Sequence, residues 1–150
     1  MEMQDVNTER FYAFERAARA MFEPSDPQDL ELGACIDLIQ RVFTATRHPQ
    51  HPVAYSGSHW ENVAERASCT LTDLDGPMFV IGLPPKRRRP WAALHEAAHA
   101  LTWHDGHGPL FAMTCIELWV MFGRWNRDAL TDLAQEFGVG SKSATSHAIV

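Results

Sequence analysis

The 150-residue sequence lacks the features of a membrane, secreted or disulfide-stabilised protein. Its longest apolar runs, such as residues 78–81, are far shorter than the roughly 20 residues of a membrane-spanning helix. Residues 1–5 have neither the positive charge nor the apolar run of a secretory signal. Cys35, Cys69 and Cys115 are odd in number and widely spaced, which predicts reduced thiols and no Cys-x-x-Cys zinc site. We therefore expect a cytoplasmic protein with no membrane partner.

The sequence also lacks the excess of positive charge that is typical of nucleic-acid-binding proteins. Lys and Arg together number 13 against 19 Asp and Glu, which gives a formal net charge of −6. Because affinity for phosphate backbones comes from excess Lys and Arg, this balance argues against nucleic acid as the main partner. The run Lys86–Arg89 is the exception. We interpret it as a solvated loop, with contact to nucleic acid or an acidic substrate as the alternative.

Nothing in the sequence divides the chain. It contains no internal repeat, low-complexity segment or Gly/Ser linker, which predicts a single domain over residues 1–150. A chain of this length can bury about 70% of its unfolded surface, so it can form a core without disulfides or a structural metal. A metal site in this protein could therefore have a functional role instead of a structural one.

The first third of the chain, residues 1–46, predicts two helices. In the first, residues 8–22, apolar side chains recur at steps of three and four, and Thr8 is the expected N-cap. In the second, Asp26 precedes a proline at the first helical position, and apolar residues recur every four positions to about Thr46. The residues that define these faces are Phe11, Phe14, Ala18 and Met21 in the first helix and Leu30, Ala34, Leu38 and Val42 in the second.

Residues 52–83 predict a small sheet, and residues 91–138 predict the helices around the motif described next. An Asp75-Gly76 turn signal between two strand-like runs indicates a hairpin. The order of elements predicts an α+β fold with an antiparallel or mixed sheet of about three strands and about five helices. The expected strands are residues 52–56, 67–72 and 78–83, and the expected helices run from Trp91 to about Trp103, from Pro109 to Gly123, and between the caps Asn126 and Gly138.

The motif His95-Glu96-Ala97-Ala98-His99 carries the clearest chemical signal. Helical residues four positions apart are rotated by about 40° and separated by about 6 Å along the axis, so both imidazoles can share one metal ion. Glu96 can reach a metal-bound water without becoming a ligand. A zinc ion in such a site lowers the pKa of its bound water to about 7, and the glutamate can accept the proton. The motif predicts a zinc-dependent hydrolase with Glu96 as general base.

A catalytic zinc ion usually takes three protein ligands and keeps a fourth position for water, so a third ligand is expected. His104 would face about 140° away from His99 if the helix continued. Asp105 lacks the glycine that precedes it in the extended motif, because Thr102 stands there. Glu117 lies near the separation at which thermolysin-like enzymes supply a glutamate; it could instead orient a ligand histidine or lie at the solvent edge of its helix. His107, at the start of the next helix, is the remaining candidate for the third ligand.

The HExxH motif followed by His107-Gly108-Pro109-Leu110-Phe111 resembles the HExxH…HGxxF arrangement of SprT-like zinc metalloproteases. The chain is more similar still to small metallohydrolases of actinobacteria and their phages. In those proteins a strand ending in Leu-Pro, here Leu83-Pro84, precedes the metal helix. The resemblance covers residues 78–123, and residues 11–15 are a weaker further match.

The resemblance implies a minimal zincin-type metalloprotease fold in which His95, His99 and His107 hold zinc and Glu96 is the general base. Phe111 should then pack inward and fix the helix that presents His107. Peptide or protein substrates are expected. The chain has no cysteine zinc ribbon of the kind that many SprT-like proteins carry, which argues against DNA-coupled targeting.

Two other classes of function are alternatives to a zinc peptidase. A non-catalytic binding protein would use the metal to stabilise its fold, and a fourth protein ligand such as His104 would be typical of it. A nucleic-acid-associated protease would bind DNA through Arg87–Arg89 in a salt-dependent manner. An open fourth ligand position would favour the hydrolase.

Overall fold

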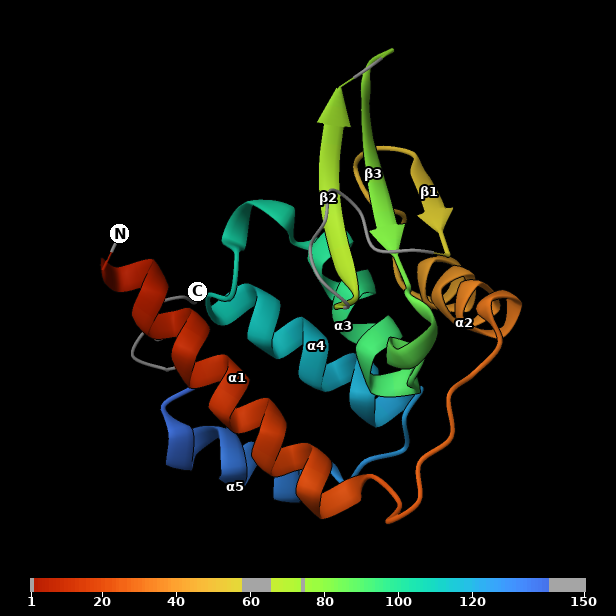
Figure 1. The fold of residues 1–150 in the computed structure, drawn as a ribbon. Coiled ribbons are helices and arrows are strands. Elements are labelled where there is room, and N and C mark those ends of the chain that lie inside the picture. The colour runs from red at the N-terminus through yellow and green to blue at the C-terminus, as the bar shows by residue number, and fades with distance from the viewer. Residues whose placement is uncertain (1, 58–65, 74, 141–150) are drawn as a thin grey trace. The chain divides into compact units, whose positions relative to one another are not determined.

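The computed structural model describes residues 2–57, 66–73 and 75–140 (Figure 1). Within those residues the chain forms five α-helices, two short 3₁₀ helices and one three-stranded mixed sheet. The predicted α+β class with a small sheet is therefore confirmed. Contacts between residues divide the chain into two compact units, one formed by Asp26–Leu101 and one by the segments that precede and follow it.

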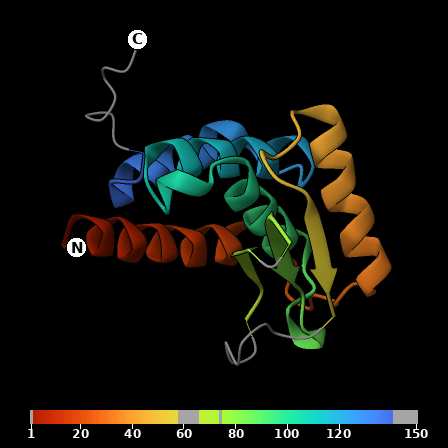
Figure 2. The same ribbon diagram turned by 90° about the horizontal axis from the view of Figure 1, so that it is seen from above.

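The unit Asp26–Leu101 contains the sheet and the helices α2 (Leu32–Ala45) and α3 (Pro90–Leu101), which pack against each other. The strand order is β1-β3-β2, with β1 parallel and β2 antiparallel to the central strand. Figure 2 shows β1 and α2 side by side within this unit. The strands are β1 (Val53–Ser56), β2 (Ser68–Asp73) and β3 (Pro77–Gly82).

The central strand β3 is the most deeply buried of the three. Residues 79–82 are all buried, as expected for an apolar run that is covered on both faces. The antiparallel pairing of β2 with β3 runs from Ser68 opposite Gly82 to Asp73 opposite Pro77, which confirms the predicted hairpin. Gly76 has a φ of 101°, a conformation that strongly favours glycine, as the turn signal predicted.

Helix α2 begins at Leu32, so the predicted start at Asp26-Pro27 was wrong. The backbone N–H of Leu30 donates a hydrogen bond to the carbonyl of Arg88 at 2.6 Å. That bond joins residues far apart in the sequence and holds Leu30 outside the helix. Local helix-start signals are weak priors that such tertiary contacts override. The C-terminal end, Ala45 with Thr46 as the cap, agrees with the prediction.

The basic run Lys86–Arg89 is partly structural. Arg88 donates from Nε to the Leu83 carbonyl at 2.9 Å and from Nη2 to the Gly57 carbonyl at 3.1 Å. The following arginine pairs with Asp29 at 2.9 Å. The first two cations of the run are exposed. Arg88 and Arg89 therefore bind groups of their own unit, and the ion pair with Asp29 offsets the charge of Arg89.

The other unit contains α1 (Glu2–Phe22), α4 (Pro109–Met121) and α5 (Arg127–Phe137), and α5 contacts both other helices (Figure 1). The predicted caps of α5 are confirmed. At the start of the helix, Asn126 Oδ1 accepts a hydrogen bond from the Ala129 N–H at 2.9 Å. At its end, Gly138 is the C-cap and has a φ of 70°. None of the described helices is long and apolar enough to cross a membrane.

Aromatic side chains from α1 and α4 form the centre of this unit. Phe11 lies with its ring centroid 5.5 Å from that of Phe14 and 4.9 Å from that of Phe111. Both α1 residues, like Ala18, are fully buried, as the spacing predicts, whereas Met21 is 55% exposed. Because α1 starts at Glu2, Thr8 lies inside the helix, and the prediction that it caps the N-terminus was wrong.

We expect Arg88→Ala to lower the free energy of unfolding by about 1–3 kcal/mol, because two carbonyls lose a charged donor. Chemical denaturation followed by circular dichroism measures the change. Lys86→Ala removes an exposed cation from the same run and should leave stability within about 0.5 kcal/mol of the wild type. Equal stabilities of the two variants would contradict a structural role for Arg88.

Candidate metal centre

His95 and His99 leave the same face of α3, and their ring nitrogens approach closely. The two Nε2 atoms are 3.2 Å apart, and the ring centroids are separated by 4.9 Å. Two nitrogen ligands at about 2.0–2.1 Å from a tetrahedral zinc ion lie about 3.3 Å from each other. The observed separation therefore matches two ligands of one ion. Without an ion between them, the same separation suits an N–H···N hydrogen bond.

Helix α3 is fixed at both ends, which fixes the two imidazoles. At the start of the helix, Arg89 forms an ion pair with Asp29 at 2.9 Å. At the other end, Nη2 of Arg47 donates to the carbonyl of Leu101 at 3.0 Å. A cation at a helix C-terminus also interacts favourably with the helix dipole. Most of the helix is buried, so the pair stands on a rigid element.

Glu96 is a buried carboxylic acid on the same helix, with a relative exposure of 6%. The pKa of the Cys69 thiol, in β2, is raised well above its ordinary value. Burial of the thiol is the main cause, and the nearby negative charge of Glu96 is the second. That thiol therefore stays neutral, as expected for a reduced cysteine. Glu96 directly follows His95 in the chain.

The segment that presents His107 turns sharply between α3 and α4. A 3₁₀ helix, Trp103–Asp105, ends at Gly106, which has a φ of 59° and a ψ of −120°. L-amino acids with a side chain avoid this combination, so glycine is required there. The Gly108 N–H then bonds to the Asp105 carbonyl at 2.9 Å, and α4 starts at the next residue. This start confirms the prediction from Gly108-Pro109.

Asp105 caps α4 and does not serve as a ligand in this arrangement. Its Oδ2 accepts a hydrogen bond from the backbone N–H of Phe111 at 2.9 Å. A Cβ atom at Gly108 would lie 2.7 and 2.8 Å from the two carboxylate oxygens, which is closer than real Cβ atoms approach. Glycine at 108 is thus explained by the close passage of the capping carboxylate. The His-Gly-Pro sequence therefore fixes the backbone at the start of α4, directly after His107.

The ring of His107 is held by side chains from α1 and α4. Oγ1 of Thr8 lies 3.2 Å from Nδ1 of the imidazole. The ring stacks on Phe11 at 5.7 Å, and Tyr12 and Phe111 lie 5.0 Å from it. When Nδ1 carries the proton and donates a hydrogen bond to the Thr8 hydroxyl, Nε2 has the free lone pair that can bind a metal ion. Phe111 is fully buried, so it packs inward as expected.

His95, His99 and His107 meet in one group. One potential ligand atom of each lies within 4.8 Å of those of the other two, which is close enough to bind a metal ion. The identity of the metal is not fixed by this geometry. Three neutral imidazoles suit zinc and other divalent transition metals.

Glu117 and His104, the other candidate ligands, lie outside this group. Glu117 forms a two-pronged ion pair with Arg127, in which the Nη2 to Oε1 distance is 3.0 Å, and its side chain is 47% exposed. It therefore lies at the solvent edge of α4, one of the positions considered for it. His104 is exposed in the 3₁₀ helix. Neither side chain is placed to complete the metal group.

Two positioning residues escape the sequence patterns. Thr8 is 99 residues from His107, so no local signal connects them. The available signal was the face of α1: Thr8, Phe11 and Tyr12 are spaced three and four apart and therefore lie on one side of the helix. The capping role of Asp105 has a local signal, since an acidic residue shortly before a helix can accept hydrogen bonds from its first N–H groups.

Comparison of the chain with protein-family models, with curated proteins and with solved structures finds no match.

We expect Gly108→Ala to destabilise the protein by about 1–3 kcal/mol and to weaken metal binding. The new Cβ would displace the Asp105 carboxylate from the N-terminus of α4, which it caps. Chemical denaturation and zinc titration measure the two effects. Gly33→Ala is the matched control, since a Cβ there meets nothing within 4 Å. It should be neutral or stabilising by up to about 1 kcal/mol. Similar effects of the two substitutions would argue against the carboxylate contact.

Proposed function

We propose that this protein is a zinc-dependent hydrolase that cleaves peptide bonds, with His95, His99 and His107 as zinc ligands and Glu96 as general base. The observation that carries the proposal is the group of three histidines, each with a ligand atom within 4.8 Å of those of the other two; a buried glutamate directly follows the first of them in the chain. The proposal extends the resemblance of residues 78–123 to SprT-like metalloproteases.

The residues present fit a catalytic zinc ion. The 3.2 Å separation of the α3 nitrogens matches tetrahedral zinc, and the described residues supply three ligands, which leaves a fourth position for solvent. Thr8 provides the hydrogen bond to the second ring nitrogen that metal-binding histidines usually make. When bound, the ion supplies an activated water and polarises the carbonyl of the substrate.

Glu96 performs the proton transfers in this proposal. Its carboxylate accepts the proton of the attacking water and later donates it to the nitrogen of the departing amine. The side chain is almost fully excluded from solvent, so its interactions with a nearby cation are little screened. Because Arg47 and the Arg89–Asp29 ion pair tie α3 to other segments at its two ends, the carboxylate is presented with little reorganisation.

The position of β2 supports a peptide as the substrate. It is one of the two edge strands among the described strands, and it contacts α3. An extended peptide could add to its outer edge through main-chain hydrogen bonds, with side chains alternating between the two faces. A peptide bound in this way would run past the helix that carries Glu96.

The alternatives have less support. A non-catalytic metal site would be closed by a fourth protein ligand, but His104 is exposed and lies outside the group. A nucleic-acid-associated protease would rely on Arg87–Arg89, and Arg88 and Arg89 already bind groups of their own unit.

We expect His107→Ala to reduce zinc content from one equivalent to a small fraction after dialysis, because one of three ligands is lost. Mass spectrometry of metal content measures the loss. Glu117→Ala, the rival third ligand, should retain one equivalent, since its partner is Arg127. Zinc loss in Glu117→Ala but not in His107→Ala would establish the thermolysin-like ligand set instead.

Glu96→Gln should keep zinc while hydrolysis of a denatured protein substrate falls by at least about 100-fold, because the ligands remain and the base is lost. Cleavage followed by electrophoresis, with parallel metal analysis, tests this expectation. Undiminished cleavage by a zinc-loaded Glu96→Gln protein would reject the mechanism. Glu117→Gln serves as the control for the loss of a carboxylate elsewhere in the chain, on α4, and should retain activity.

A further inference from the structure

A groove of about 480 Å³ lies between α4 and α5, two helices of the same unit (Figure 1). Its apolar walls are formed by Met113 and Ile116 of α4, by Ala134 of α5, and by Val139 just beyond α5. Met113 is 61% exposed, the highest value for a large apolar side chain in the described residues. Exposed apolar side chains along a groove are typical of a surface that binds a partner. Methionine suits this role because its flexible side chain adapts to the ligand.

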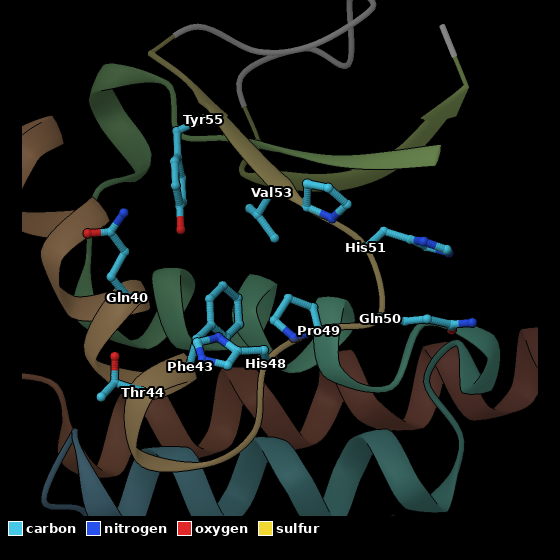
Figure 3. Close-up of a pocket in the computed structure, with 10 residues that line it drawn as sticks. Gln40, Phe43, Thr44, His48, Pro49, Gln50, His51, Val53 and Tyr55 are labelled. Atoms are coloured by element: carbon cyan, nitrogen blue, oxygen red, sulfur yellow. The ribbon is translucent and has the colours of Figure 1, made fainter. Parts of the chain in front are cut away.

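The cavity between β1 and α2 offers no comparable selection of a ligand. Figure 3 shows its lining, in which amide, hydroxyl and two imidazole groups lie beside Phe43 and Val53. It opens to solvent, and a lining of this kind favours neither charged nor neutral ligands. In the groove between α4 and α5, by contrast, the two ionised groups of the lining, Glu117 and Arg127, bind each other. The rest of that groove therefore offers mainly apolar contact.

The walls of this groove offer few main-chain hydrogen bonds to a ligand. Both walls are helices, whose N–H and C=O groups bond within the helix. Beyond α5, the N–H of Gly138 donates to the Gln135 carbonyl at 3.1 Å, and that of Val139 donates to the Ala134 carbonyl at 2.8 Å. An extended peptide would leave its main-chain groups without partners there, whereas a helix satisfies them internally. The groove therefore favours a helical ligand with an apolar face.

An acidic stripe on α5 lies beside the groove. Asp128, Asp132 and Glu136 are exposed, recur every four residues, and each directly follows a residue that lines the groove. Each is rotated by about 100° from that lining residue, so the stripe lies on the solvent side of the α5 wall. Within the described residues neither Asp132 nor Glu136 takes part in an ion pair. Arg10, close to Gly138, offsets part of the charge. The stripe favours a ligand with Lys or Arg beside its apolar face.

We propose that this groove binds a basic amphipathic helix of a partner protein. Apolar side chains of that helix enter between α4 and α5, and its cations face the acidic stripe. A second copy of this chain is disfavoured as the occupant, because it would bring a second acidic stripe and a second formal charge of −6. The lining of the groove includes none of the three histidines of the metal group, so the proposal does not rest on the proposed function.

The probe is the capped peptide Ac-Lys-Ala-Leu-Lys-Ala-Leu-Leu-Lys-Ala-Leu-Lys-Ala-NH₂, which as a helix has leucines on one side and lysines beside them. Titrated into ¹⁵N-labelled Glu96→Gln protein and followed by NMR, it should cause saturable shifts at the amides of Thr131, Gln135 and Gly138. Three changes to the peptide should each weaken binding at least tenfold: all lysines to glutamate, all leucines to serine, or the fifth residue to proline, which breaks the helix. Absence of binding, or shifts confined to the unit Asp26–Leu101, would overturn the proposal.

Met113→Lys puts a cation in the wall of the groove and should weaken binding of the peptide at least tenfold. Met21→Lys is the matched control, because Met21 is similarly exposed, at 55%, on α1 and outside the groove. It should bind the peptide within twofold of the parent protein. Circular dichroism shows whether both variants retain their helices. Equal binding by the two variants would contradict docking in the groove.

The acidic stripe is tested by the double variant Asp132→Asn, Glu136→Gln. It should bind the peptide at least threefold more weakly at low salt, and the difference should disappear at high salt, where exposed charges are screened. The control Glu31→Gln, Asp37→Asn removes two exposed carboxylates at α2 and has the same change in net charge. Equal losses in the two double variants would show attraction to the net charge alone and would count against the stripe.

Two rival occupants of the groove are tested with the same full-length protein. Sedimentation shows whether the chain self-associates, and a dimer that Met113→Lys dissociates would assign the groove to a second copy. Ile149→Asp alters the segment 141–150, which follows the groove residue Gly140 in the chain. We expect no such dimer and unchanged affinity of Ile149→Asp for the peptide. Such a dimer, or peptide binding strengthened at least tenfold by Ile149→Asp, would overturn the proposal. None of these measurements depends on zinc or hydrolysis.

Discussion

Two imidazole nitrogens 3.2 Å apart on one buried helix constrain the rest of the site. Their lone pairs would repel each other at this distance unless a proton or a cation lay between them. The helix is not free to relieve the repulsion by moving, because Arg47 binds its C-terminal end, Arg89 pairs with Asp29 at its start, and most of its residues are buried. A divalent ion bound there would replace the proton and attract both rings. The same helix carries the buried Glu96, so in the proposed function two of the three ligands and the general base depend on the packing of one element.

The third histidine is positioned by a different set of forces. A capping carboxylate, a glycine with positive φ and a glycine that allows close passage fix the backbone around His107. The hydroxyl of Thr8 and three aromatic rings then fix the orientation of its side chain. These contacts contribute to stability as well as to the site, since Phe11 and Phe111 also form the centre of the aromatic core. Substitutions in that core are therefore expected to affect metal affinity through ring orientation.

Features with local causes were predictable from the sequence, and features with distant causes were not. The shared face of His95 and His99, the Asn126 cap and the β2–β3 hairpin each depend on residues a few positions apart. The late start of α2 depends on a bond between Leu30 and Arg88, and the partner of His107 lies on the first helix. Among the candidate third ligands, helix geometry argued against His104, but only tertiary structure could show that Glu117 pairs with Arg127 at the solvent edge.

X-ray absorption spectroscopy at the zinc K-edge, on the purified protein loaded with one equivalent of zinc, tests the proposed metal centre most directly. Three imidazoles and one solvent oxygen predict a first shell of four nitrogen or oxygen atoms at about 2.0–2.1 Å, with the outer-shell scattering of three histidine rings. The His107→Ala protein, if it can be loaded, should show two rings. A sulfur ligand, or a wild-type spectrum with the scattering of two or four histidine rings, would contradict the three-histidine site with an open position.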